Sequence, residues 1–198
     1  MPLTFRSMKL KTTLLGLCVA LLCTLTVPAM AQDDPALLQG RAETREMAAD
    51  ALAALYEIQP AARYVIEHAA GYAVFSAFGI KLFFAGGSQG KGVVVNNRTH
   101  RQTFMKMVGV QAGLGLGIKK DRIIFVFETA DALRSFVDQG WEFGVSTSVA
   151  AAAQGQGGTF AGAISVSPGV YVYRLTETGL AAQIAATGTR FYKDDALN

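Results

Sequence analysis

Four glycines and a lysine crowd into one short stretch, Gly86 to Gly92, which reads GGSQGKG. Successive backbone N–H groups in a glycine-rich turn can form a nest that binds a phosphate or another anion. The spacing is not that of a nucleotide-binding P-loop, because no serine or threonine follows the lysine to hold magnesium. Glycine at this density indicates either tight turns or a backbone that another group approaches closely. We favour a glycine hairpin formed by Gly86, Gly87, Gly90 and Gly92, with Lys91 at its tip.

Basic side chains recur around this motif. We expect eight of them in or next to turns of a β-rich body, interleaved with Phe83, Phe84 and Phe104. The eight are Lys81, Lys91, Arg98, Arg101, Lys106, Lys119, Lys120 and Arg122. If the turns share one end of the fold, they form a basic patch in which each base is worth about 1 kcal/mol at an anionic lipid surface. The alternative is that these charges are scattered over solvated loops.

The residues that carry most enzyme chemistry are few. The chain has 2 histidines, His68 and His100, with no HExxH or paired-histidine spacing for zinc. No serine stands in a Gly-x-Ser-x-Gly elbow. Helix capping and a solvated face explain the carboxylates between Glu128 and Glu142. We therefore expect no catalytic residue, metal or cofactor. A hydrolase would need a cleft that brings a serine or a carboxylate near one of the histidines.

The first 31 residues have the order of a secretory signal peptide. Three basic residues precede an apolar run, Thr12–Val27, and a small-x-small sequence ends at Ala31. We expect cleavage after Ala31 and a periplasmic or secreted protein of residues 32–198. Lipoprotein anchoring is less favoured, because Cys18 and Cys23 each follow leucine rather than a small residue.

Removing this segment changes the charge balance. The whole chain has 18 basic and 15 acidic residues, and three of the basic ones lie in the expected signal peptide. The processed chain is therefore neutral overall, which argues against nucleic acid as a partner. It also loses both cysteines, which excludes a disulfide or a cysteine-ligated metal site. Residues 32–70 are acidic on balance, whereas the remainder is mildly basic.

Two helices are predicted before the β-rich body. Apolar residues at i, i+4 spacing predict an amphipathic helix over Ala36–Ile58, and a shorter helix follows over Ala61–His68. The first helix could lie on a membrane surface, but its acidic polar face favours packing against a sheet. One further helix is predicted near 129–139, with Thr129 as N-cap and Gly140 as its end.

The rest of the chain, 71–193, reads as mainly β. Two apolar runs, Tyr72–Phe78 and Ile80–Ala85, predict buried strands on either side of Gly79. The other expected strands are His100–Val110, Gln111–Ile118, Ile123–Phe127, Trp141–Val149, Phe160–Ser167, Gly169–Leu175, Gly179–Thr187 and Thr189–Lys193. We expect a flexible loop at Ala150–Gly158. Many short strands predict a compact antiparallel barrel or sandwich, so the expected class is α+β in a single domain.

Four segments together resemble one known family. GYAVFSAFGIKLFFAGGSQGKGVVV, VGVQAGLGLG, FETADALRSFVDQGWEFGVSTSVA and GLAAQIAATGTRFYK occur in that order. Over about Glu43 to Lys193 they resemble the SYLF domain in its bacterial, secreted form. Ser76 departs from the usual Val-Phe-Pro, and residues 182–185 lack the usual glycines. The resemblance implies a lipid-binding module without enzymatic activity. In eukaryotic members it is associated with phosphoinositide binding through an amphipathic N-terminal segment, and with actin.

These observations lead to one main hypothesis and two alternatives. The main hypothesis is a periplasmic module that binds anionic phospholipid headgroups or a membrane surface. For an exported bacterial protein the available anions would be phosphatidylglycerol, cardiolipin or lipopolysaccharide phosphates. The first alternative is a structural or partner-binding envelope protein, suggested by the glycine- and alanine-rich segment 141–153. The second is a hydrolase.

Overall fold

A computed structural model of the chain describes residues 34–82, 85–112, 117–143, 162–180 and 188–198. Residues 36–198 form one compact unit, and only residues 34 and 35 of the preceding unit are described. The expected signal peptide and the expected loop at 150–158 lie outside the described residues. Within those ranges no helix is long and apolar enough to cross a membrane.

Three helices occupy the predicted positions. They are α2 (Pro35–Ile58), α3 (Ala61–His68) and α4 (Ala130–Gln139). Thr129 caps α4, because its Oγ1 accepts a hydrogen bond from the Ala132 N–H at 3.2 Å. Gly140 ends the same helix with a φ of 70°, a left-handed value that glycine adopts without steric cost. Both predicted caps of α4 are confirmed.

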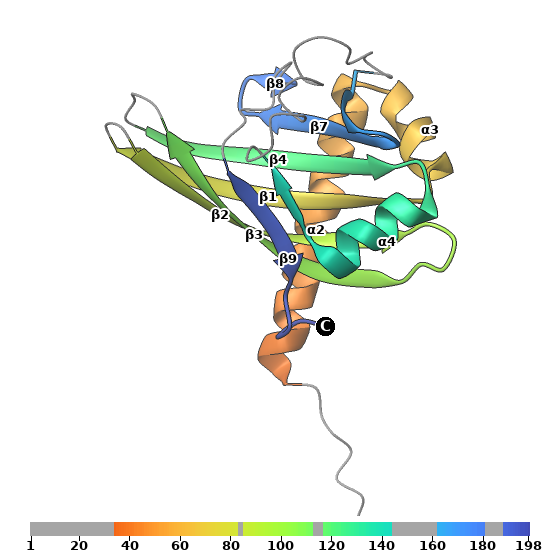
Figure 1. Ribbon diagram of the computed structural model, residues 1–198, viewed down its shortest axis with the longest axis horizontal. Coiled ribbons are helices and arrows are strands. Elements are labelled where there is room, and N and C mark those ends of the chain that lie inside the picture. The colour runs from red at the N-terminus through yellow and green to blue at the C-terminus, as the bar shows by residue number, and fades with distance from the viewer. Residues whose placement is uncertain (1–33, 83–84, 113–116, 144–161, 181–187) are drawn as a thin grey trace, which may run out of the picture. The chain divides into compact units, whose positions relative to one another are not determined.

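The β-rich body is one curled antiparallel sheet (Figure 1). Its strands are β1 (Gly71–Leu82), β2 (Ala85–Asn96), β3 (Gln102–Ala112), β4 (Gly117–Phe127), β5 (Trp141–Phe143), β6 (Ile164–Ser167), β7 (Val170–Thr176), β8 (Gly179–Leu180) and β9 (Thr189–Lys193). The described strands follow the order β5-β9-β3-β2-β1-β4-β7-β6, and β8 pairs with β7. The predicted α+β class with an antiparallel, barrel-like body is confirmed, although β1 to β4 have 11 or 12 residues each and are not short.

Both faces of the sheet are buried near the Gly71 end of β1. Side chains alternate between the two faces along a strand. Phe75 belongs to a core beneath α4, where its ring centroid lies 4.8 Å from that of Phe191. Val74 belongs to a second core on the opposite face, which α2 and α3 cover with Leu55 and Ile66. The amphipathic first helix therefore packs on the sheet, as its acidic polar face predicted.

The predicted glycine hairpin is wrong. Gly86, Gly87, Gly90 and Gly92 lie inside β2, each paired with a residue of β1, and none has a positive φ. A Cβ at Gly92 would overlap the ring of Phe75 and lie 2.5 Å from the Val74 carbonyl oxygen. Close approach, the other interpretation of this glycine density, explains Gly90 and Gly92, because no side chain fits between the backbone and its neighbours.

Two other boundaries differ from the predictions. The two apolar runs on either side of Gly79 form a single strand, β1. The basic segment at 119–122, predicted as a turn, lies inside β4, where Asp121 is buried and its Oδ2 accepts a hydrogen bond from Arg174 at 2.5 Å. The predicted strand Gln111–Ile118 joins the end of β3 to the start of β4, and its centre lies outside the described residues.

Candidate functional site

Strand register arranges the side chains of β1 to β4 in rows across the sheet. The first row on the face that α2 covers is buried, and it consists of Ile124, Val74, Val93 and Phe104. Every second residue along a strand returns to this face. The next three rows therefore lie on the same face and move step by step away from the core. In Figure 1 the strand ends that carry them extend beyond the helices.

The second row, here called the basic row, consists of Arg122, Ser76, Lys91 and Lys106. Lys106 forms an ion pair with Asp194 at 2.7 Å, and the side chain of Asp194 is only 5% exposed. The hydrogen bond to Asp194 raises the pKa of Lys106 above its ordinary value. Lys91 approaches Glu43 of α2 at 3.8 Å, and both side chains are more than half exposed.

The third and fourth rows become apolar. The third row, here called the middle row, consists of Lys120, Phe78, Gln89 and Val108. The fourth row, here called the apolar row, consists of Ile118, Ile80, Gly87 and Val110. Ile118 and Val110 are 66% and 67% exposed, and Phe78, Ile80 and Val108 are exposed as well. Five large apolar side chains thus face solvent on three strands, with Phe78 and Ile80 on β1, Val108 and Val110 on β3, and Ile118 on β4.

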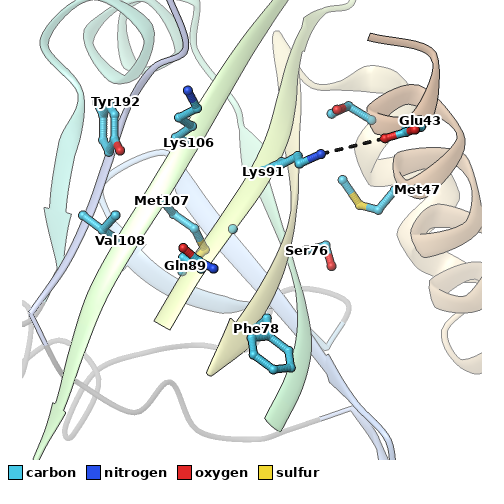
Figure 2. A pocket seen from close by; sticks show the side chains of 12 residues that line it. Glu43, Met47, Ser76, Phe78, Gln89, Lys91, Lys106, Met107, Val108 and Tyr192 are labelled. Atoms are coloured by element: carbon cyan, nitrogen blue, oxygen red, sulfur yellow. Dashed lines mark ion pairs between the residues drawn. The ribbon is translucent and has the colours of Figure 1, made fainter. Parts of the chain in front are cut away.

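A groove of about 520 Å³ runs between α2 and the residues of the basic and middle rows. Glu43 and Met47 of α2 line one side, and Lys91, Phe78 and Val108 line the sheet side. Figure 2 shows Lys91 reaching from β2 toward Glu43, with Met47 beside them. The basic row therefore borders a largely apolar depression rather than a tight polar pocket.

The structure brings together four of the eight predicted basic residues. Lys91, Lys106, Lys120 and Arg122 lie on the face that α2 covers. They project from strands, so the prediction of basic turns is wrong for them. Their common face arises because neighbouring strands are in register, which brings residues distant in sequence side by side.

The other four predicted basic residues lie elsewhere. Lys119 is on the opposite face, since it is adjacent to Lys120 in β4. Arg98 and Arg101 belong to the β2–β3 turn at the other end of the strands, where Asn96 Oδ1 accepts hydrogen bonds from the N–H groups of Arg98 and Thr99 at 3.0 Å. The backbone of Lys81 is in β1, and its side chain lies outside the described part of the chain.

The two histidines are exposed and far apart in the sequence. His68 ends α3, where its ring stacks on Tyr64 and its Nδ1 lies 2.8 Å from the Tyr64 carbonyl oxygen. His100 lies in the β2–β3 turn with a φ of 56°. Neither lines the groove beside the basic row.

Sequence reasoning missed the exposed apolar side chains of the middle and apolar rows. Phe78 and Ile80 read as part of a buried strand because they continue the apolar pattern of the β1 core. Alternation alone places a residue on a face, but it does not say where the covering helix ends. The one signal in the sequence that could have revealed these exposed residues is that lysines stand close to them along the chain.

Comparisons with known proteins relate the chain to a family model and to a bacterial protein. Residues 108–198 match the family model Ysc84, described as "Las17-binding protein actin regulator". The chain is also similar to a protein named "Beta cell expansion factor A" from Aeromonas veronii, with 31% identity over 110 residues. That alignment covers 56% of this chain and 41% of the relative. The chain thus spans about two fifths of the length of this relative.

Proposed function

This chain belongs to the SYLF (Ysc84) family, and we propose that it is a non-enzymatic periplasmic module that binds anionic phospholipid headgroups at a membrane surface. The observation that carries this proposal is the common face of Lys91, Lys106, Lys120 and Arg122, which lie on β2, β3 and β4 of one sheet. An array of cations beside exposed apolar side chains matches the chemistry of an anionic lipid surface, which presents phosphates above hydrocarbon.

The four cations are not equivalent. Asp194 lies 2.7 Å from Lys106 and is nearly buried, so it offsets most of the Lys106 charge. Glu43 offsets Lys91 only in part, because both groups are well exposed and solvent weakens their attraction. Lys91, Lys120 and Arg122 are therefore the residues that we expect to attract phosphates, each by about 1 kcal/mol near the surface.

The sheet, rather than the first helix, is the proposed binding element. For eukaryotic members, the SYLF resemblance implied lipid binding through an amphipathic N-terminal segment. Here the apolar stripe of α2 is occupied by the sheet, since Ala51 and Leu55 are completely buried. Freeing that stripe would expose the core beneath it. The open basic and apolar rows require no such rearrangement.

Co-sedimentation with vesicles tests this function. Residues 32–198 suit the experiment, because both cores described above are built from residues 36–198 alone. We expect binding to vesicles containing phosphatidylglycerol and little binding to neutral phosphatidylcholine vesicles. The triple variant Lys91→Ala, Lys120→Ala, Arg122→Ala should lose affinity by roughly a hundredfold, since three contributions of about 1 kcal/mol are removed.

The matched control is Arg98→Ala with Arg101→Ala, which removes charge at the opposite strand end and should bind almost as the parent does. Binding to charged and neutral vesicles alike, or to neither, would contradict the proposal. Recovery of an envelope protein by crosslinking, together with no vesicle binding, would favour the partner-binding alternative.

A further inference from the structure

We propose that the apolar row and its neighbours insert into an anionic bilayer, so that the ends of β1, β3 and β4 anchor the protein. This inference rests on the proposed function and deepens it by assigning the inserting element. The groups concerned are Phe78, Ile80, Val108, Val110 and Ile118. Ile80 pairs directly with Ile118 on β4, and between Ile80 and Val110 the apolar row holds Gly87 of β2, which has no side chain.

The order of the rows supports insertion. Two residues along a strand advance about 6.7 Å, so the apolar row lies roughly 13 Å beyond the basic row. Peripheral elements bury their apolar face about 5–10 Å into the boundary between headgroups and acyl chains. A tilted sheet would therefore place the side chains of Ile80 and Val110 among acyl chains, while Lys91 and Arg122 remain at the level of the phosphates.

The opposite face of the same strand ends is polar or bare. Lys119 pairs with Gly79, which pairs with Ser88, and Ser88 pairs with Gly109. The strand ends are thus amphipathic across the thickness of a single sheet. Only the face that carries the apolar row would enter the membrane, and Lys119 would point toward water.

A second copy of this chain is the competing occupant of the apolar row. In a two-fold contact the same surface meets itself. Such a contact would bring the cations beside the apolar row of both copies, Lys120 and Arg122 among them, to one interface, and like charges repel each other. An anionic bilayer covers the apolar row and neutralises the adjacent cations, so charge complementarity favours the bilayer.

An environment-sensitive probe tests the insertion. Residues 32–198 contain no cysteine, because both cysteines of the chain lie before residue 32. We would label Val110→Cys with the fluorophore NBD and add phosphatidylglycerol vesicles. The expected result is a blue shift with at least a twofold rise in emission, quenched by lipids that carry a shallow nitroxide. The matched control, Thr99→Cys with NBD, lies in the exposed β2–β3 turn and should not respond.

The outcomes separate the two proposals. If the labelled protein sediments with the vesicles and the probe at position 110 stays in water, insertion is refuted while headgroup binding stands. If no vesicle binds the protein, both proposals fail. If the emission rises with protein concentration in the absence of vesicles, a second copy covers the row and the inference is wrong.

A variant with Ile80→Asp and Val110→Asp should keep its circular dichroism spectrum and lose binding at least tenfold, since both side chains are exposed.

Discussion

At Gly92 the backbone of β2 passes directly beneath the ring of Phe75. That ring belongs to the core under α4, where it also contacts Phe125 at a centroid distance of 6.0 Å. Because Gly92 has no Cβ, the Phe75 ring occupies the space that a side chain at position 92 would need. Glycine at position 92 therefore determines how closely the backbone of β2 can approach the Phe75 ring of β1.

We expect Gly92→Ala to lower the free energy of unfolding by about 1–3 kcal/mol, the usual cost of forcing an extra methyl group into a packed core. The added Cβ would overlap the Phe75 ring and crowd the Val74 carbonyl oxygen. Urea denaturation measures the change. Gly87→Ala is the control, because its Cβ would meet nothing closer than the Gly109 carbonyl oxygen at 3.9 Å. Equal losses for the two variants would refute this packing role.

The same residues show why sequence alone misplaced the glycine motif. Glycine serves tight turns and close packing equally well, and its one-letter pattern does not distinguish them. The partner that makes Gly92 necessary is Phe75, 17 positions earlier, and only the strand register brings the two together. The distinction therefore depends on tertiary packing.

At the scale of elements, local signals predicted the helices better than the strands. Thr129 and Gly140 mark helix ends by their own backbone chemistry, and α4 begins and ends where those residues indicate. Gly79 gave a misleading signal, because it lies inside β1 and does not break the strand. The positions of the helices on the two faces could not be predicted, since they depend on which strands are neighbours.

The first helix contributes stability by covering one face of the sheet. Leu55 is fully buried against that face. We expect Leu55→Ala to cost about 2–5 kcal/mol of unfolding free energy, the range for truncating a buried leucine. Thermal and urea unfolding followed by circular dichroism would measure it.

Leu38→Ala is the matched change on the same helix, and it should alter stability by no more than about 0.5 kcal/mol because Leu38 is 49% exposed. A membrane-seeking first helix would give a different result. In that case Leu55→Ala would leave stability unchanged and reduce vesicle binding.

At the scale of the whole molecule, the face that α2 covers passes from core to solvent in four steps. A buried row comes first, and the basic row, the middle row and the apolar row follow along β1 to β4. The sequence predicted that the basic residues among them form a surface for anionic lipid. It did not separate Lys120 from Lys119, because their division between two faces follows from a strand where a turn had been expected.

Charge reversal at these two neighbours tests the central claim most directly. Lys120→Glu and Lys119→Glu change the net charge equally, but the side chains lie on opposite faces of β4. Removing one attraction and adding one repulsion at the membrane face should cost about 2 kcal/mol, or roughly a thirtyfold loss of binding to phosphatidylglycerol vesicles, for Lys120→Glu. Lys119→Glu should lose less than about threefold, because its charge is directed away from the surface. Equal losses for the two variants would contradict a membrane-binding face on this side of the sheet.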